Sequence, residues 1–166
     1  MAISSQDFRD RLRHFPSGVT IVTVKSGNRM HGLTVSAFAS VSPKPPLIMI
    51  VVDQQHSGYA LLKEPGAVFA VNILARDQME LSNRFAWIKD EDRFKAGDWG
   101  TAATGAPILQ DALAWLDCTI DSSLDSGSHT IFIGLVQASG TPRPGEAPLV
   151  YWNRGYRHLS LQEEEE

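Results

Sequence analysis

The sequence of 166 residues has one cysteine, no long apolar run and no long run of basic residues. The single cysteine, Cys118, excludes an internal disulfide, and the five histidines lack the close spacing of metal ligands, so we expect no metal site. No apolar stretch approaches the ~18 residues that a membrane span needs, and residues 1–13 lack the apolar region of a secretory signal. We therefore expect a cytoplasmic protein without a membrane partner. A formal net charge of −4 also disfavours nucleic acid as a partner.

The common nucleotide and nucleophile motifs are absent as well. The sequence contains no Gly-x-Gly-x-x-Gly, no phosphate-binding loop ending in Gly-Lys-Ser/Thr, and no Gly-x-Ser-x-Gly. This excludes the Rossmann, P-loop and nucleophile-elbow sites that these motifs build. Any cofactor must be held by another arrangement.

The first segment has the pattern of an amphipathic helix. Ser4 suits an N-cap, and Phe8, Leu12 and Phe15 share one helical face. Pro16 ends the segment, because proline disfavours helical geometry in the residue before it. Ser57 and Asp77 are also predicted to cap helices.

The rest of the chain is rich in strands. Runs of β-branched and apolar residues predict strands, and turn-like breaks separate them. These strands are expected at residues 18–24, 32–38, 47–52, 67–74, 113–120, 130–137 and 149–159. Residues 90–105 are charged and glycine-rich, so we expect a long surface loop. The absence of β-α-β alternation favours a single mainly β domain over residues 1–166, an antiparallel sheet or barrel with peripheral helices. We expect the acidic residues 163–166 to be a solvated tail.

Short hydroxyl side chains alternate within residues 34–42. Thr34 and Ser36 share one face of the expected strand, and Ser40 and Ser42 continue the spacing if the strand persists. Such a row lets a flat polar ligand approach the backbone and supplies hydrogen-bond donors. The same spacing also fits the solvent-facing side of an antiparallel strand, or a turn before Pro45.

Three further features can serve either a ligand or the fold. His129 precedes an expected strand, where it can donate to a ligand or lie in a surface turn. Arg84 can bind phosphate or favour the C-terminus of its helix. The late cluster can stack on a ring, pack in the core or form a subunit interface; it comprises Tyr151, Trp152, Arg154 and Tyr156.

Six segments in order resemble one known family. They are residues 15–23, 32–42, 45–47, 71–74 with 83–86, 127–134, and 148–152 with 155–157. In these segments the chain is similar to the flavin reductase-like family with the FMN-binding split barrel. That family includes the reductase components of two-component flavin monooxygenases, such as the one that acts on hydroxyphenylacetate. The resemblance covers residues 8–159, but Ser128 stands where the family commonly has an acid, which affects how His129 is oriented.

The resemblance implies a mainly β, antiparallel Greek-key split barrel and a set of site residues. The flavin ring and ribityl chain would be wrapped by Thr34, Val35, Ser36, Ala37, Ser40, Val41 and Ser42. By the same resemblance, His56 and Ser57 would meet the ribityl or phosphate end, and Arg84 and Phe85 would lie close to the flavin. His129 would lie where the nicotinamide stacks over the ring. Family members are homodimers, so Tyr151 and Tyr156 would serve the ligand or the interface.

The implied activity is hydride transfer from NADH or NADPH to FMN or FAD, with the reduced flavin supplied to a partner monooxygenase. An FMN-holding electron-transfer protein on the same barrel is the first alternative. A pyridoxamine phosphate-type oxidase would need a basic phosphate cluster, and the basic residues here are dispersed. A ligand-free interaction domain is the last alternative.

Overall fold

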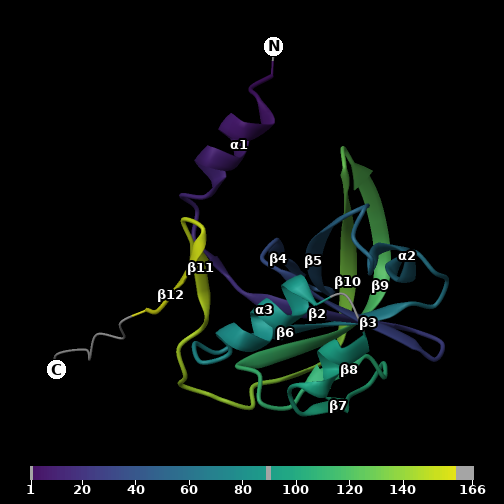
Figure 1. Cartoon of the computed structure of the whole chain (residues 1–166). Helices are drawn as coiled ribbons and strands as arrows, with labels where there is room; N and C mark the ends of the chain where they lie inside the picture. The colour runs from purple at the N-terminus through teal and green to yellow at the C-terminus, as the bar shows by residue number, and fades with distance from the viewer. Residues whose placement is uncertain (1, 89–90, 160–166) are drawn as a thin grey trace.

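The computed structural model describes residues 2–88 and 91–159, and Figure 1 shows the whole chain. It begins with α1 (Ser5–Leu12), and the predicted N-cap is confirmed, because the Ser4 hydroxyl accepts a hydrogen bond from the Asp7 N–H at 3.0 Å. None of the residues of α1 is buried. The helix projects away from the sheets (Figure 1), so Phe8 and Leu12, half exposed at 52% and 55%, do not pack in the core of this chain.

A seven-stranded antiparallel sheet forms the body of the molecule. Its strand order is β3-β2-β6-β9-β10-β5-β4. The strands are β2 (Thr20–Ser26), β3 (Arg29–Val35), β4 (Phe38–Pro43), β5 (Pro46–Asp53), β6 (Val68–Ile73), β9 (Ala114–Ser126) and β10 (His129–Gly140). The sheet curls strongly (Figure 1). A cluster of buried apolar side chains packs against it.

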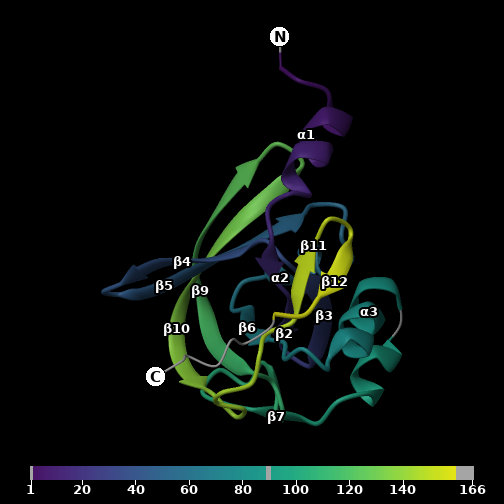
Figure 2. The same ribbon diagram turned by 90° about the vertical axis from the view of Figure 1, so that its left-hand side faces the viewer.

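Smaller elements flank this sheet. A three-stranded sheet contains β1 (Ser17–Gly18), β11 (Val150–Trp152) and β12 (Gly155–Arg157), and a hairpin contains β7 (Trp99–Thr101) and β8 (Pro107–Leu109). The helices are α2 (Tyr59–Leu62), α3 (Met79–Trp87) and the 3-10 helix η1 (Glu91–Lys95). Figure 2 shows β11 and β12 between the base of α1 and α3.

The structure corrects two predicted helix caps. The N-cap of α2 is Gly58 rather than Ser57, and the N-cap of α3 is Gln78 rather than Asp77. The Asp77 carboxylate instead accepts two hydrogen bonds from the Arg143 guanidinium, at 2.8 and 3.0 Å, and this pairing lowers its pKa. A tertiary ion pair therefore replaces the expected cap.

The prolines at 43, 45 and 46 lie at the turn of the β4–β5 hairpin, where Pro43 pairs with Pro46, and β4 is an edge strand, which tolerates proline. One expectation about an irregular segment is wrong. Residues 90–105 are not one long loop, since they contain η1 and β7; part of that stretch lies outside the described residues.

The core lies on both sides of β2. One apolar cluster fills the curled sheet and includes Val22, Phe69 and Phe132. A second cluster lies under α3 and includes Ile21 and Phe85, both fully buried. Phe85 of α3 packs in the same cluster as Ile21 of β2, and β3 is the neighbour of β2 in the sheet. This packing holds α3 against the end of β3, where the candidate site lies.

Candidate functional site

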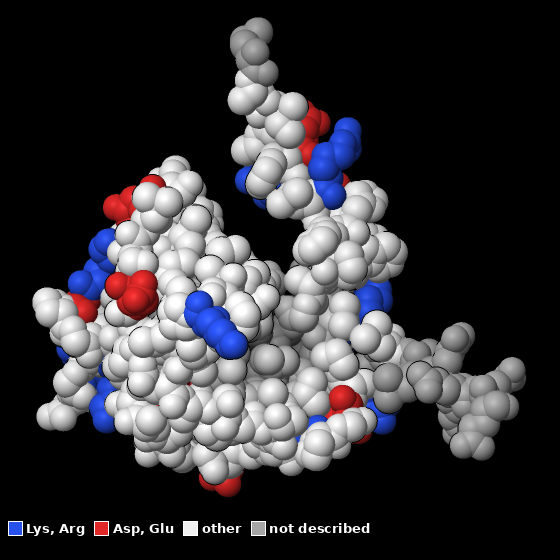
Figure 3. Space-filling view, turned by 180° about the vertical axis from the view of Figure 1, so that it is seen from behind, with Lys and Arg blue, Asp and Glu red and all other residues white. Residues whose placement is uncertain are grey.

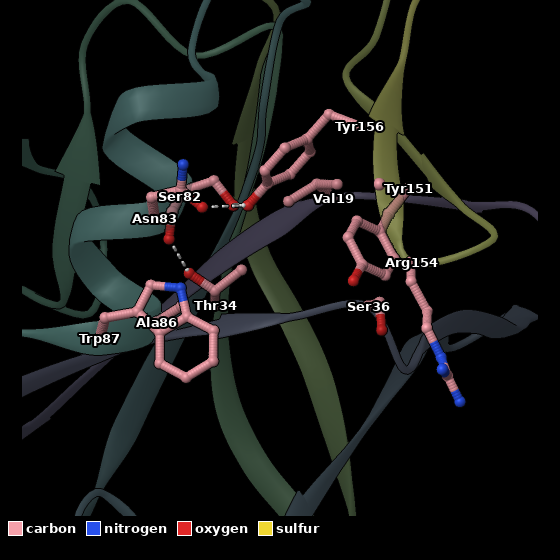
Figure 4. Close-up of a pocket in the computed structure, with 11 residues that line it drawn as sticks. Val19, Thr34, Ser36, Ser82, Asn83, Ala86, Trp87, Tyr151, Arg154 and Tyr156 are labelled. Atoms are coloured by element: carbon pink, nitrogen blue, oxygen red, sulfur yellow. Dashed lines mark hydrogen bonds between the residues drawn. The ribbon is translucent and has the colours of Figure 1, made fainter. Parts of the chain in front are cut away.

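A pocket of about 340 Å³ lies between the end of β3, α3 and the β11–β12 hairpin (Figure 4). Trp87 lies beside Thr34 and Asn83 on one side of the pocket, and Tyr151 and Ser36 lie on the other, with the Tyr156 hydroxyl reaching Ser82 (Figure 4). Its lining residues are Val19, Thr34, Ser36, Ser82, Asn83, Ala86, Trp87, Tyr151, Arg154, Gly155 and Tyr156.

A chain of hydrogen bonds joins the three elements around the pocket. The Thr34 hydroxyl donates to the Ser82 carbonyl at 2.6 Å, which ties β3 to α3. The Ser82 hydroxyl and the Tyr156 hydroxyl are hydrogen-bonded at 2.8 Å, and Tyr156 donates to the Asn83 side-chain oxygen at 3.0 Å. These bonds fix the spacing of the walls.

The backbone turns sharply where β3 ends. The Phe38 N–H donates to the Ser36 carbonyl at 3.0 Å, and the Val51 N–H of β5 donates to the Ala37 carbonyl at 3.0 Å. This turn carries Ser36 at the pocket and starts β4 in a new direction. The predicted hydroxyl row is therefore split. Thr34 and Ser36 line this pocket, whereas Ser40, Val41 and Ser42 line a second cavity beside β5.

The aromatic walls come from β11, β12 and α3. The Tyr151 and Tyr156 rings meet edge to face with centroids 5.4 Å apart. Trp87, the last residue of α3, is 79% exposed and stands at the opposite side of the pocket (Figure 4). Aromatic rings around a small pocket favour a planar ligand.

The face of α3 at the pocket differs from the residues chosen by resemblance. Arg84 donates through Nε to the Arg93 carbonyl at 3.1 Å, and Phe85 is fully buried in the core under α3. The pocket-lining residues on α3 are Ser82, Asn83, Ala86 and Trp87. These four residues are separated by one, three or four positions, so they lie on one face of the helix. This helical spacing is the sequence signal that could have identified them.

His56 and Ser57 belong to a separate polar cluster at the other end of β3. The Ser57 hydroxyl lies 3.0 Å from His31 Nε2, and the His31 and His56 rings are 5.8 Å apart. Burial, with the nearby Arg93 guanidinium, lowers the pKa of His31 to about 4 and lowers that of His56. Both imidazoles are therefore neutral at neutral pH.

His129 is exposed at the start of β10 and does not line the pocket. Its Nδ1 lies 2.9 Å from the Ser128 hydroxyl, so the serine occupies the place beside the ring where the resembled family carries an acid. In the sheet His129 pairs with Asp53 of β5, two residues along from Val51, which bonds to Ala37.

The donor set fits a flavin better than a metal ion. No group of three or more potential metal-ligating side chains gathers within residues 2–88 and 91–159. The pocket volume falls in the range of about 300–1,000 Å³ for small-molecule sites. Hydroxyls and an amide can bond the polar edge of a flat ring, and aromatic walls can cover its faces.

In the described part of the chain, no helix is long and apolar enough to cross a bilayer.

The curled antiparallel sheet and this pocket define a β-barrel protein with a cavity that suits a flat, polar ligand. The flavin reductase like domain matches residues 12–160, and the chain belongs to that family. The FMN reductase (NADH) RutF of Agrobacterium fabrum is 36% identical over 156 residues, which cover 93% of this chain and 88% of RutF. The reductase subunit HsaB of a flavin-dependent monooxygenase from Rhodococcus jostii is 34% identical over 93% of this chain and 78% of its own.

Solved structures agree with the sequence relatives. The NADH:FAD oxidoreductase SgcE6 of Streptomyces globisporus superposes with a TM-score of 0.88 at 31% identity, covering 97% of this chain and 98% of that one. The predicted fold class, a mainly β split barrel with peripheral helices, is confirmed. The chain is therefore an oxidoreductase of the flavin reductase type.

Proposed function

We propose that this protein transfers hydride from NADH or NADPH to FMN or FAD, and that the flavin binds in the pocket between β3, α3 and the β11–β12 hairpin. The observation that carries this proposal is the hydrogen-bonded frame of Thr34, Ser82 and Tyr156, which brings hydroxyl groups and aromatic rings together around one pocket. When bound, the flavin supplies the hydride acceptor and the reduced nicotinamide supplies the donor. The protein has to bind both rings, orient them and exclude water.

The residues divide these tasks by their position. Ser36 and Thr34 present small polar groups, so a ring can approach the strand backbone closely. Tyr151 and Trp87 cover the faces of a ring and remove water from it. His129 is proposed to position the nicotinamide rather than to move a proton, since hydride transfer to flavin needs little acid–base help.

We further propose a homodimer that covers the outer face of β5 and β10. Cross-strand pairs on that face are apolar and only partly buried in the single chain; they are Leu47 with Leu135, Met49 with Ile133, and Val51 with Ile131. Figure 3 shows a hollow between the projecting α1 and the body, with few charged side chains on its walls. A second copy could bury this face and the apolar side of α1.

Analytical sedimentation tests the proposed homodimer. The wild-type protein should sediment as a dimer, and Met49→Asp should dissociate it. A wild-type monomer would contradict the proposal.

The relatives also favour a partner oxygenase. HsaB is a reductase subunit of a monooxygenase, and we propose that this protein likewise supplies reduced flavin, in the cytoplasm, to an enzyme that uses it. Because Trp87 and Arg154 at the pocket are both largely exposed, the pocket opens to solvent, and reduced flavin can leave it by diffusion.

The direct test is the loss of nicotinamide absorbance on addition of flavin. Purified protein is mixed with FMN, FAD or riboflavin and with NADH or NADPH, and flavin-dependent oxidation supports the proposal. Thr34→Val removes the bond to Ser82 and should raise the KM for flavin several-fold, whereas Thr101→Val, an exposed threonine on β7, should leave it unchanged. Flavin that stays bound without turnover of added flavin would favour the electron-transfer alternative.

A further inference from the structure

The turn between β11 and β12 carries an arginine where backbone geometry favours glycine. Trp152 pairs with Gly155, so Asn153 and Arg154 form a two-residue hairpin turn. Their φ angles are 48° and 62°, both in the left-handed region. Turns of this kind prefer Asn-Gly, and a side chain other than Asn or Asp at the second position is strained.

The glycine of this segment, Gly155, follows the two turn residues, and its own φ is not positive. It therefore does not relieve the strain at Arg154. Among non-glycine residues in the described chain, Asn153 and Arg154 alone have positive φ. Residues held in strained backbone geometry concentrate at functional sites, where the side chain has a use that offsets the strain.

Arg154 lies at the edge of the flavin pocket, with its guanidinium on the side away from Trp87 (Figure 4), and it is the one formally charged residue among those that line the pocket. The other polar groups there are hydroxyls and an amide. A guanidinium has five N–H donors in a fork that matches phosphate oxygens. A pocket that is neutral except for one arginine at its edge fits a ligand with a ring and an anionic group.

Arg154 is held by a carboxylate on α1. Its Nη2 lies 3.0 Å from the Asp10 carboxylate, and the arginine side chain is 60% exposed. Two other bonds join the hairpin to the chain after α1: Trp152 Nε1 donates to the His14 carbonyl at 3.0 Å, and the Asn153 N–H donates to the Arg13 carbonyl at 2.9 Å. The hairpin therefore does not need the ion pair to keep its place.

We propose that Arg154 binds a phosphate group of a nucleotide in the pocket, and that Asp10 is the counter-ion which this phosphate displaces. The inference rests on the proposed function and deepens it by naming the residue that recognises the anionic part of the ligand. The phosphate can belong to the flavin or to the nicotinamide dinucleotide.

Two ligand pairs distinguish these sources. FMN is compared with riboflavin, and NAD⁺ with nicotinamide riboside, by quenching of tryptophan fluorescence in the absence of turnover. Arg154→Gln should weaken the phosphorylated member of one pair about tenfold and leave its unphosphorylated partner within about twofold. The pair that responds identifies the source. Asp10→Asn should tighten the same phosphorylated ligand about twofold to threefold, because it removes the competing carboxylate.

Arg154→Gly separates binding from folding. Glycine relieves the strained turn, so the thermal midpoint should stay equal to that of the wild type or rise, while phosphate recognition is lost as in Arg154→Gln. Arg29→Gln removes the same charge from a 70% exposed arginine that pairs with Glu64 and does not line the pocket, and it should bind like the wild type.

Each other outcome overturns the inference. Equal weakening of both members of a pair would show a general structural role, and unchanged binding would show that Arg154 contacts no phosphate. A lower midpoint for Arg154→Gly would show that the arginine serves the fold. If the wild type binds no flavin and oxidises no nicotinamide, the proposed function fails with it; if the wild type does both, failure of the Arg154 variants concerns this inference alone.

Discussion

Gly32→Ala tests whether the packing of α3 on β3 builds the pocket. A Cβ added at Gly32 would lie 2.3 Å from Phe85 Cε1 and 2.6 Å from Cδ1, far inside contact distance. Phe85 cannot move aside freely, since it is fully buried and its ring meets the Phe94 and Trp99 rings at centroid distances of 5.3 and 5.4 Å. Alanine at position 32 therefore has to push α3 away from β3.

The expected loss of folding free energy follows from the overpacking of the core. Extra atoms in a packed core cost about 1–3 kcal/mol, and the rigidity around Phe85 places this case at about 2 kcal/mol. For a chain of 166 residues that corresponds to a thermal midpoint lower by about 4–8 °C. Displacement of α3 also stretches the 2.6 Å bond from Thr34 to Ser82, so flavin affinity should fall together with stability.

Denaturant unfolding and flavin titration measure the two effects. Gly18→Ala is the matched control, because a Cβ there meets nothing within 4 Å, and it should change neither quantity. Phe85→Leu in the Gly32→Ala background should recover part of the stability, since it removes the clashing ring atoms. The reasoning is refuted if Gly32→Ala matches the wild type in stability, or if it loses stability while flavin affinity stays intact.

Other predictions concern single groups. The burial of His31 lowers its pKa to about 4, so below about pH 6.5 the unfolded chain binds a proton on this imidazole more readily than the folded chain does. The free energy of unfolding should therefore be highest above about pH 6.5 and fall by about 1–2 kcal/mol as the pH drops toward 4. His31→Gln should reduce this pH dependence in unfolding experiments. Tyr156→Phe removes the hydroxyl that bonds Ser82 and Asn83, and should cost about 1–2 kcal/mol in chemical unfolding and raise the flavin KM. His129→Ala should lower turnover without abolishing flavin binding, and equal turnover would defeat the proposed positioning role.

Local patterns in the sequence predict many of the elements correctly. The β-branched run that forms β2, the apolar run in β5 and the Ser4 cap of α1 depend on neighbours within a few residues, and the structure has each of them. The hydroxyl pair Thr34 and Ser36 also follows from strand alternation alone. Short-range periodicity and capping suffice for these features because their geometry is set within the element.

The missed features depend on contacts between distant segments. Asp77 pairs with Arg143 instead of capping α3, and the turn after Ser36, with the bulge between Ser40 and Ser42, sends the rest of the hydroxyl row to another cavity. No local pattern encodes these events.

Strand periodicity and turn residues act over short distances, so the sequence alone predicts a strand-rich antiparallel protein and its family resemblance. Which faces meet depends on tertiary contacts. The tertiary structure buries Phe85 in the core, presents Trp87 to the pocket, and brings Arg154 beside Asp10 across the length of the chain. Which side of a helix faces a pocket depends on where its other side packs, and that packing is a property of the whole fold.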